Sequence, residues 1–430
     1  MLIEFRVGNY LSFKNPVTFS MEAASISEHE EDNVFEFDKY KLLKSAVIYG
    51  ANASGKSNLI KAMSFMEMFV FNSSKDTQAK EPIKVENFRL STETENEPSF
   101  FEIEFICDQK KFRYGFEVDK NRVHSEWLFF TPSRREAKLF VRDENSIQIS
   151  TRSFKEGKGL EEKTRSNALF LSVVAQFNGE ISTKILNWFR VFKNISGLDD
   201  QSYKKFSASQ FKNEDFRQKF VKYLKIADFG IDDITVDDSE ISELREALGK
   251  VGKVLQSKLD EKIDMDIFID IFVEISTLHS KYDDKHKKIP SKVIFKLKNE
   301  SEGTQKFFGI LRPILDTLDE GSILVVDELD ARFHPLITRF IIQLFHSKQT
   351  NPNNAQLIFA THDTNLLTNK LFRRDQIWFT EKDQYDATDL YSLVEYKNVR
   401  KDAIYEKDYI AGKYGAVPFI KNFEVLLGDE

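Results

Sequence analysis

The sequence predicts an α/β fold in which a parallel sheet is accompanied by an N-terminal antiparallel β subdomain and an inserted helical subdomain. Three patterns indicate this. Over residues 45–69 a short apolar strand runs into a glycine loop and then into a helix. Two continuous apolar runs, at 323–326 and 357–360, are typical of strands that a parallel sheet buries on both faces. From about residue 167 to 265, period-two segments give way to helical spacing.

Alternation of apolar and polar residues predicts antiparallel strands in the first part of the chain. Apolar side chains occupy every second position at 3–7 and at 17–21, which is typical of a β-ribbon. The same alternation recurs at 101–105, 112–118 and 123–129 and predicts an antiparallel meander. We therefore expect a first lobe over residues 1–165 that contains both the glycine loop and the meander.

A helical subdomain is expected over residues 166–265. Apolar residues recur at helical spacing there, for example at 185–189 and 241–248. The helix expected near 239–263 is about 25 residues at most, too short for the many heptads of a long coiled-coil arm. The region is therefore predicted to be a compact insertion.

A second lobe is expected over residues 266–400, followed by a tail at 401–430. Alternating strands at 271–277 and 293–297 predict a hairpin with a charged tip at 281–288. Beyond it, a helix opens at Ser301 and leads to the two apolar strands of the parallel sheet.

Composition limits the function classes. The 430 residues include 62 basic and 69 acidic side chains, a net charge of -7, which argues against a chain that coats nucleic acid by bulk charge. The single Cys107 cannot form an internal disulfide, which favours a reducing compartment. No 18 apolar residues run together, and the N-terminus does not resemble a signal peptide. A soluble, cytoplasmic protein without a membrane span is predicted.

The strongest chemical signal is the stretch Gly50-Ala51-Asn52-Ala53-Ser54-Gly55-Lys56-Ser57, which satisfies the P-loop pattern G-x-x-x-x-G-K-[ST] between a strand and a helix. Its glycines let successive N–H groups curl toward phosphate oxygens, and the following helix adds its positive end. Lys56 is expected to reach the β- and γ-phosphates of ATP and Ser57 to bind Mg²⁺. The residues expected to hold the nucleotide here are Gly50, Asn52, Ala53, Ser54, Gly55, Lys56, Ser57 and Asn58.

A second signal is the apolar strand 323–326, which ends in Asp327 and Glu328. Asp327 is the expected partner of the magnesium ion. Glu328 then stands where a general base could polarise water for in-line attack on the γ-phosphate. One carboxylate after a strand is commonly a turn residue, but two carboxylates downstream of a P-loop favour catalysis.

Two weaker signals complete the set. Ser301 and Gly303 open a helix, and a helix N-terminus built from small residues attracts anions, although Ser301 could be only an N-cap. His362 is the second residue after the strand 357–360, where an imidazole could hydrogen-bond and sense the γ-phosphate. A lone histidine after a strand is usually structural; its place after the Asp327 strand favours function.

The order of these motifs resembles the ABC-type ATPases of the branch that contains the RecF and SMC proteins. That resemblance implies an ABC-type head and hydrolysis in a head-to-tail dimer, in which Ser301 and Gly303 act on the partner's γ-phosphate. It also implies that Asp330 lies in the loop crossing the dimer interface and that His362 is the switch histidine. The family's lobe-joining glutamine is not obvious: Gln176 is a candidate, and an ordinary helix residue is an equally good interpretation.

A narrower resemblance covers nearly the whole chain, to the bacterial abortive-infection AAA-family ATPases of the AbiLi and RloA type. The segments that carry it are 49–58, 300–304, 327–335, 375–381 and 412–418. It implies a separate effector, often a nuclease, and a role in anti-phage defence. Glu302 and Thr304 depart from the Leu-Ser-Gly-Gly-Gln signature of transporter ATPases, which weakens a transporter interpretation.

These resemblances imply an ATPase that acts as a nucleotide-driven switch for the effector. Two alternatives to this function stay open. One is a RecF/SMC-like DNA-binding clamp in repair or maintenance. Candidate DNA contacts are Arg134, Arg135, Lys204, Lys205, Lys212, Lys219, Lys222, Lys225 and the hairpin tip. Phenylalanines at 206, 211, 216 and 220 interleave with the helical lysines, and an amphipathic helix with a phenylalanine core is the favoured interpretation.

The other alternative is a fused nuclease of the overcoming-lysogenization type. Only 68 residues follow His362, and they contain no convincing set of metal carboxylates. The seven histidines and Cys107 show no zinc-ligand spacing, so Mg²⁺ is the one metal expected.

Overall fold

The computed structural model describes residues 1–75, 78, 80–132, 135–190, 192–197, 209–236, 275–397, 399–400 and 403–418. The chain forms two compact units, each described below by itself. The first unit comprises Met1–Ile195, Thr317–Leu329 and Ile342–Glu430, and the second comprises Ser196–Asp316 and Asp330–Ile341. The four-part division expected from the sequence stays a prediction.

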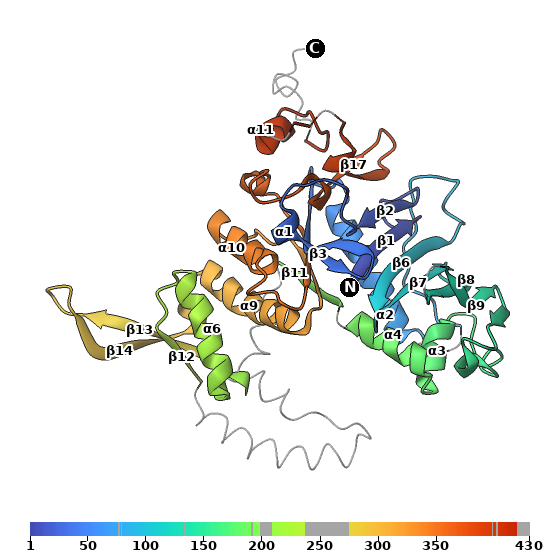
Figure 1. The fold of residues 1–430 in the computed structure, drawn as a ribbon, viewed down its shortest axis with the longest axis horizontal. Coiled ribbons are helices and arrows are strands. Elements are labelled where there is room, and N and C mark those ends of the chain that lie inside the picture. Colours follow the sequence, from blue (N-terminus) through green and yellow to red (C-terminus); the bar gives the residue numbers. More distant parts are fainter. Residues whose placement is uncertain are drawn as a thin grey trace, which may run out of the picture. The chain divides into compact units, whose positions relative to one another are not determined.

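A seven-stranded antiparallel sheet occupies the N-terminal part of the first unit (Figure 1). Its strands, in spatial order, are β10 (Ser146–Ile149), β9 (Ala137–Asp143), β8 (Val123–Thr131), β7 (Lys110–Val118), β6 (Ser99–Cys107), β1 (Leu2–Gly8) and β2 (Val17–Ser20). The pairing of Phe5 with Ile103, and of Val7 with Phe101, places the alternating apolar residues on one face. The antiparallel strands expected from period-two alternation are confirmed, and β9 and β10 extend the meander further than predicted.

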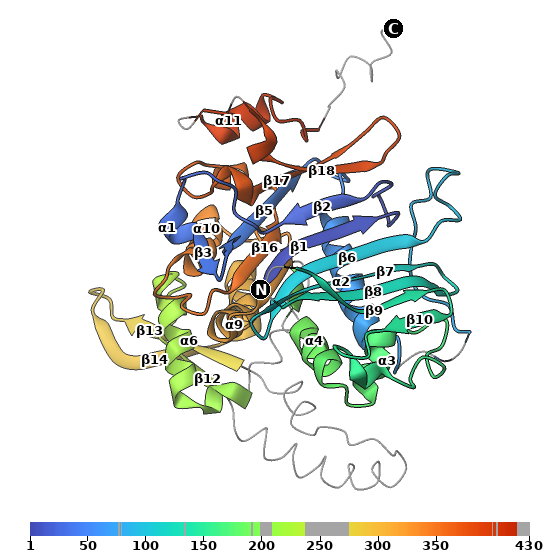
Figure 2. The same cartoon turned by 45° about the vertical axis from the view of Figure 1, so that its right-hand side comes forward.

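A six-stranded sheet forms the other layer of the first unit (Figure 2). Its strands, in spatial order, are β11 (Phe192–Ser196), β15 (Ile323–Asp327), β16 (Gln356–Ala360), β5 (Ser45–Gly50), β17 (Ile377–Lys382) and β18 (Thr388–Ser392). β15, β16, β5 and β17 run parallel, and β18 returns antiparallel to β17. The parallel pairing expected for the two continuous apolar runs is therefore confirmed.

The helix after the glycine loop packs its apolar face on the antiparallel sheet. Helix α2 (Lys56–Asn72) buries Leu59, Met63, Met66 and Phe69 at roughly helical spacing. The Phe69 ring meets Phe116 of β7 edge-on, with centroids 5.4 Å apart. Burial of this apolar face holds the start of α2 beside the parallel sheet.

The remaining elements range from short turns to the long helix α9. The helices are α1 (Glu30–Asn33), α3 (Phe170–Gln176), α4 (Glu180–Arg190), α6 (Glu214–Ile226), α9 (Glu302–Glu320), α10 (Pro335–His346) and α11 (Tyr405–Ile410). The other strands are β3 (Val34–Phe37), β4 (Tyr40–Leu43), β12 (Asp233–Val236), β13 (Ile275–Tyr282) and β14 (Lys288–Lys296). Turns of 3₁₀ helix lie at Lys155–Gly157, Ser209–Lys212, Leu297–Asn299, Thr364–Leu366, Arg374–Gln376 and Leu393–Glu395. β11 and β12 interrupt the stretch expected to be helical.

The second unit contains an antiparallel sheet in the order β12-β13-β14 and a phenylalanine core. Phe211 and Phe220 are buried, and their rings lie 5.5 and 4.9 Å from the ring of Phe308 in α9. These two residues are therefore core residues, as the amphipathic-helix interpretation predicts. Of the expected DNA contacts, Arg134, Lys204, Lys205 and the Lys212 side chain lie outside the described residues, as do the expected helix at 239–263 and Phe206.

The hairpin differs in one respect from its prediction. β13 continues to Tyr282 and β14 already begins at Lys288. The tip of the hairpin is therefore confined to residues 283–287. The strands extend into this polar stretch because each added cross-strand pair of residues satisfies backbone N–H and C=O groups. Within the described residues, no helix has the length and apolar character needed to cross a membrane.

Candidate functional site

Three of the predicted segments leave the parallel sheet at one edge. β16 lies between β15 and β5, with Val326 paired to Phe359 and Ala360 paired to Ile48. Because these strands are parallel, their carboxyl ends meet (Figure 2). The P-loop after β5, Asp327–Glu328 at the end of β15 and Thr361–His362 after β16 therefore gather at the edge where open α/β sheets bind ligands.

The P-loop lysine is held inside its own loop. The Lys56 ammonium donates to the carbonyl oxygens of Gly50, at 2.7 Å, and Ala51, at 3.1 Å, and only 6% of the residue is exposed. Asn52 and Ala53 form the exposed tip of the loop, while Ser57 and Asn58 in the first turn of α2 are partly exposed. The loop thus presents a cation and the N-terminus of α2 together, as phosphate binding requires.

Gly55 is required at the end of the loop by conformation and by space. Its φ of 117° lies in the region that favours glycine, and a Cβ there would come 2.5 Å from the Thr388 hydroxyl oxygen. The Thr388 hydroxyl donates to the carbonyl oxygen of Ser54 at 2.8 Å and lies 2.8 Å from the Ser12 hydroxyl. Asn58 donates to the same Ser12 hydroxyl at 2.8 Å. The loop is therefore fixed from two distant parts of the chain.

Sequence reasoning missed these supporting residues. Ser12, Thr380 and Thr388 lie far from the P-loop in sequence, and the buried hydroxyl groups of Thr380 and Ser54 are 2.6 Å apart. Only Thr380 carries a signal, because it ends the apolar run of β17, the strand paired with β5 at Gly50.

The carboxylates at the end of β15 have the character expected of a cation site. Oδ1 of Asp327 is buried and has no hydrogen-bond partner among the described residues. An unpaired buried carboxylate oxygen is costly unless a cation or proton donor satisfies it, so this residue fits Mg²⁺. Glu328 follows in a left-handed conformation, with φ of 53°, and the Leu329 N–H donates to the Ala360 carbonyl at 3.1 Å. That bond fixes the turn that carries Glu328.

His362 is exposed at the same edge between fixed neighbours. The Thr361 N–H donates to the Ile48 carbonyl at 3.2 Å, and the Tyr49 hydroxyl donates to the Asp363 carbonyl at 3.1 Å. Tyr49 directly precedes Gly50, so the backbone on either side of His362 is tied to the P-loop strand.

The expected signature residues belong to the second unit. Ser301 is placed just before α9, and its hydroxyl accepts a hydrogen bond from the Thr304 N–H at 3.1 Å. Gly303 packs closely on the loop after Asp330, because a Cβ there would lie 3.0 Å from the Arg332 carbonyl oxygen. The second unit thus brings the start of α9 and the loop expected at a dimer interface into contact.

Gln176, the candidate lobe-joining glutamine, is the exposed last residue of α3. Its amide donates to the Ser74 carbonyl, at 3.1 Å, just beyond α2. Its role stays a prediction. Among the described residues, no group of three or more His, Cys, Asp or Glu side chains is arranged to hold a metal ion.

One buried and one partly buried titratable group support the sheet and helix of the site. His346 is buried at the end of α10, with Nε2 2.7 Å from the Ser45 hydroxyl at the start of β5, and burial lowers its pKa to about 3. Glu67 on α2 accepts a hydrogen bond of 2.6 Å from Asn194 of β11, and burial raises its pKa to about 7. His346 is therefore neutral at physiological pH, while Glu67 titrates there.

Most of the chain matches a known protein family. Residues 45–368, about three quarters of the chain, match the family model described as "AAA domain, putative AbiEii toxin, Type IV TA system". No curated protein sequence matches the chain. The matched range begins with β5 and ends after His362, so it contains each segment expected to bind nucleotide.

Proposed function

The chain belongs to this family of Abi-like AAA P-loop ATPase domains, and on that premise we propose that it is an ATPase acting as a nucleotide-driven switch in anti-phage abortive infection. The observation that carries the proposal is the meeting of the P-loop, Asp327–Glu328 and His362 at one edge of a parallel sheet. Each segment supplies one part of the phosphoryl-transfer machinery.

The reaction assigns each side chain one task. Lys56 binds the β- and γ-phosphates, and Glu328 accepts a proton from the water whose oxygen attacks the γ-phosphorus. The bond from the γ-phosphorus to the bridging oxygen breaks, giving ADP and phosphate. Ser57 and Asp327 would hold Mg²⁺, which neutralises charge developing on the phosphate oxygens. His362 would hydrogen-bond the γ-phosphate and report its presence.

Head-to-tail pairing is the finer part of the proposal. In an ABC-type head, Ser301 and Gly303 of one copy would close on the nucleotide bound by the other, with Asp330 in the interface loop. The contact of Gly303 with the Arg332 carbonyl supports this, because it joins the signature helix and that loop in one element. A separate effector, with a nuclease as one candidate, would receive the resulting change of state, and the abortive-infection family supports such an assignment.

The variant Glu328→Gln tests this proposal most directly. It removes the base while keeping size and hydrogen bonding, so ATP turnover should fall by about 10²–10⁴-fold while ATP binding persists. Light scattering after size exclusion should then show an ATP-dependent dimer. Lys56→Ala is the control, in which both nucleotide binding and pairing are lost. Turnover by Glu328→Gln at the parental rate would refute the base assignment, and a monomer with ATP bound would refute the pairing.

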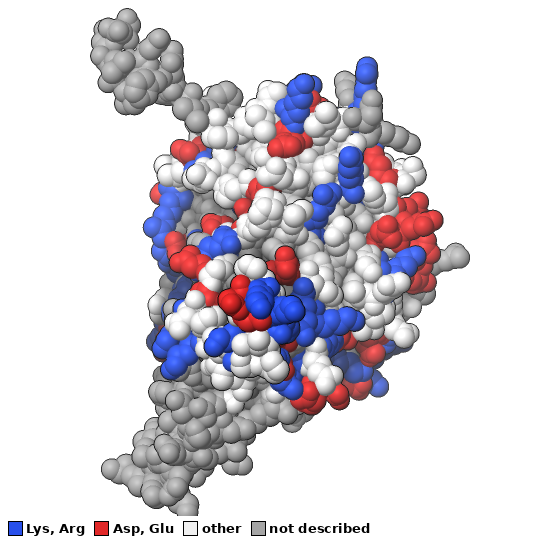
Figure 3. Space-filling model, turned by 90° about the vertical axis from the view of Figure 1, so that its left-hand side faces the viewer, with Lys and Arg blue, Asp and Glu red and all other residues white. Residues whose placement is uncertain are grey.

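A RecF/SMC-like DNA clamp is the second candidate, and one surface favours it. The hairpin β13–β14 carries six lysines against two aspartates over residues 275–296, within a chain of net charge -7. Alternation places Lys288, Lys292 and Lys296 on one face, and all three are exposed. Figure 3, which looks onto the side where the hairpin projects, shows blue side chains gathered around a smaller red group.

Reversing two of these lysines tests the clamp. Lys288→Glu/Lys292→Glu should weaken binding to duplex DNA and reduce the slope of log K against log salt by about 2, because each lysine neutralises about one phosphate. Lys348→Glu/Lys370→Glu changes two exposed lysines of the first unit by the same charge and serves as control. Equal DNA binding by both variants and the parent would exclude the hairpin as a DNA contact.

A further inference from the structure

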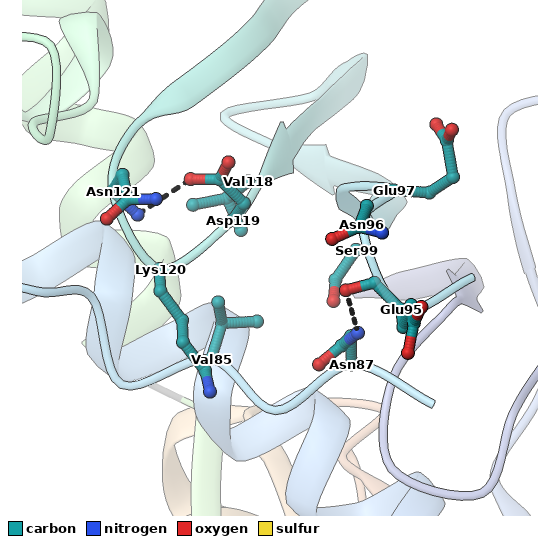
Figure 4. Close-up of a pocket in the computed structure, with 10 residues that line it drawn as sticks. All are labelled: Val85, Asn87, Glu95, Asn96, Glu97, Ser99, Val118, Asp119, Lys120 and Asn121. Atoms are coloured by element: carbon teal, nitrogen blue, oxygen red, sulfur yellow. Dashed lines mark hydrogen bonds between the residues drawn. The ribbon is translucent and has the colours of Figure 1, made fainter. Parts of the chain in front are cut away.

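Three cavities beyond the nucleotide edge differ in charge. A small one of about 180 Å³ is lined by Glu95, Glu97 and Asp119 against Lys120 (Figure 4). Another, of about 590 Å³, has three glutamates against two lysines. The third, of about 640 Å³, has the opposite balance: Lys397, Arg400, Lys407 and Lys413 against one carboxylate. This third cavity, called the C-terminal cavity below, has the volume of a small-molecule site.

Among the residues that the structure describes, few negative charges compensate the cations of the C-terminal cavity. Asp408 accepts a hydrogen bond of 2.5 Å from Lys413, which lowers the pKa of Asp408 and keeps it ionised. Lys397, Arg400 and Lys407 form no ion pair with any of the residues described between 1 and 418. Three positive charges therefore face one concave space in a chain of net negative charge, which favours an anionic occupant.

The cavity wall is held in place by buried and partly buried tyrosines. The Tyr396 hydroxyl donates to the Tyr414 carbonyl at 2.9 Å, the Tyr391 hydroxyl lies 2.9 Å from the same carbonyl, and the Tyr409 hydroxyl donates to the Ala416 carbonyl at 2.9 Å. Tyr409 stacks on Phe379 of β17, with centroids 5.5 Å apart. These bonds fix the wall before any ligand arrives, which lowers the entropic cost of binding.

Aromatic and apolar groups lie beside the cations. Tyr396 and Tyr414 line the cavity with ring centroids 5.5 Å apart, and Ile404 lines it with 64% of its surface exposed. An exposed apolar side chain next to these cations suits a ligand with a planar, weakly polar ring and a phosphate. A nucleoside phosphate has both parts, whereas a bare inorganic ion would leave the apolar wall uncovered.

The cavity is also connected to the nucleotide edge. Tyr409, in helix α11 of the cavity wall, places its ring 5.9 Å from that of Tyr49, the residue before Gly50. Glu406, next to Lys407, accepts a hydrogen bond of 3.2 Å from Thr364, two residues after His362. A ligand that shifts α11 would therefore act on both the P-loop strand and the His362 segment.

From this arrangement we propose that the C-terminal cavity binds a nucleoside phosphate, as a second nucleotide site distinct from the P-loop. The binding proposal goes beyond the ATPase function and does not depend on hydrolysis. Its regulatory consequence, a change in ATP turnover when the cavity is filled, rests on the proposed function.

Binding is tested in the full chain carrying Lys56→Ala, so that the P-loop does not contribute. We expect AMP to bind more tightly than pyrophosphate or adenosine by calorimetry, because only AMP covers both the cations and the apolar wall. Lys397→Glu/Lys407→Glu, added to Lys56→Ala, should weaken AMP binding by roughly tenfold or more, since two attractions become repulsions. The matched control Lys348→Glu/Lys370→Glu should bind like the parent.

Three results would overturn the proposal. They are no AMP binding at millimolar concentration, adenosine binding as tightly as AMP, and an equal loss of AMP binding in the cavity and control variants. None of them bears on Glu328, so failure here stays distinguishable from failure of the ATPase proposal. If both hold, AMP should change the ATP turnover of the otherwise unaltered chain, and the cavity variant should lose that response.

Discussion

Two helix N-termini expected to bind phosphate are built differently. Helix α2 begins after Gly55, and no side chain among the described residues caps it. Helix α9 begins after Ser301, whose hydroxyl already accepts from the Thr304 N–H at 3.1 Å. The sequence presents both as small-residue helix starts, yet α2 keeps its first N–H groups for a ligand, whereas α9 satisfies one within its own chain.

This difference predicts the order in which the two helix N-termini contact phosphate. We expect the N-terminus of α2 to bind phosphate without rearranging a side-chain cap, while Lys56 exchanges a bond to the Gly50 carbonyl for one to the phosphate. For Ser301 to contact a phosphate, its hydroxyl must exchange an internal hydrogen bond for an external one. We therefore expect nucleotide binding at α2 to come first and closure on α9 to follow.

The largest expected effect comes from removing one polar group at each helix. Lys56→Ala should abolish detectable ATP binding, because it deletes the cation that meets the β- and γ-phosphates. Ser301→Ala should leave ATP binding to the monomer intact, reduce turnover and pairing, and lower the free energy of unfolding by about 1 kcal/mol through loss of the cap. Fluorescent-nucleotide titration, turnover and chemical denaturation measure the three quantities. Equal loss of ATP binding in both variants would remove the proposed order.

A smaller effect is expected from glycine replacements at the same two places. Gly55→Ala should impair ADP binding, because φ of 117° and the 2.5 Å approach to Thr388 force the loop to shift. Gly303→Ala should retain ADP binding, since among the described residues the Arg332 carbonyl alone lies closer than ordinary van der Waals contact, at 3.0 Å, and alanine favours the helix.

Gly159→Ala separates strain from crowding in this comparison. Gly159 has φ of 82°, but, its chain neighbours apart, no atom of the described residues lies within 4 Å of a Cβ built there. Its replacement should lower stability without touching nucleotide binding, as measured by thermal denaturation with and without ADP. A Gly303→Ala variant that loses ADP binding as fully as Gly55→Ala would break the contrast between the helices.

The smallest effect concerns pH and the middle of α2. Burial raises the pKa of Glu67 to about 7, above its value in the unfolded chain, so the native state binds the proton more tightly. This stabilisation is complete below about pH 4.5 and is lost as pH rises through 7. Relative to Glu67→Gln, the parent should lose about 2 kcal/mol of unfolding free energy between pH 5 and 8.

Denaturation across that pH range measures the loss, with the exposed Glu31→Gln as control. A parent and Glu67→Gln variant whose stabilities run parallel with pH would show that Glu67 does not titrate in this window. His346 contributes in the opposite direction, because burial lowers its pKa to about 3: its stabilisation is present above pH 6.5 and is lost as pH falls.

Much of the fold could be predicted because its elements carry strong local patterns. Continuous apolar runs identified β15 and β16, and strict alternation identified β6, β7 and β8. β11 and β12 could not be predicted, since four- and five-residue strands with lysine, asparagine and aspartate have no clear period. Their strand conformation comes from pairing with distant segments.

The residues of the site also fall into those that could be predicted from the sequence and those that could not. The residues expected to touch nucleotide stand in contiguous motifs and could be named from the sequence. The residues that hold the loop in shape, Ser12, Thr380 and Thr388, could not, because a single buried hydroxyl has no sequence pattern. The C-terminal cavity could not be predicted either, because its lysines line one cavity only in the folded chain, where tyrosine hydrogen bonds hold their segments together.

The neighbours of β5 have a consequence for synthesis of the chain. β5 ends at residue 50, but its two partners in the sheet, β16 and β17, end at Ala360 and Lys382. At roughly 5–20 residues per second, translation takes tens of seconds to pass from one to the other. β5 must wait unpaired for that time, so the P-loop cannot take its final form until β17 has left the ribosome.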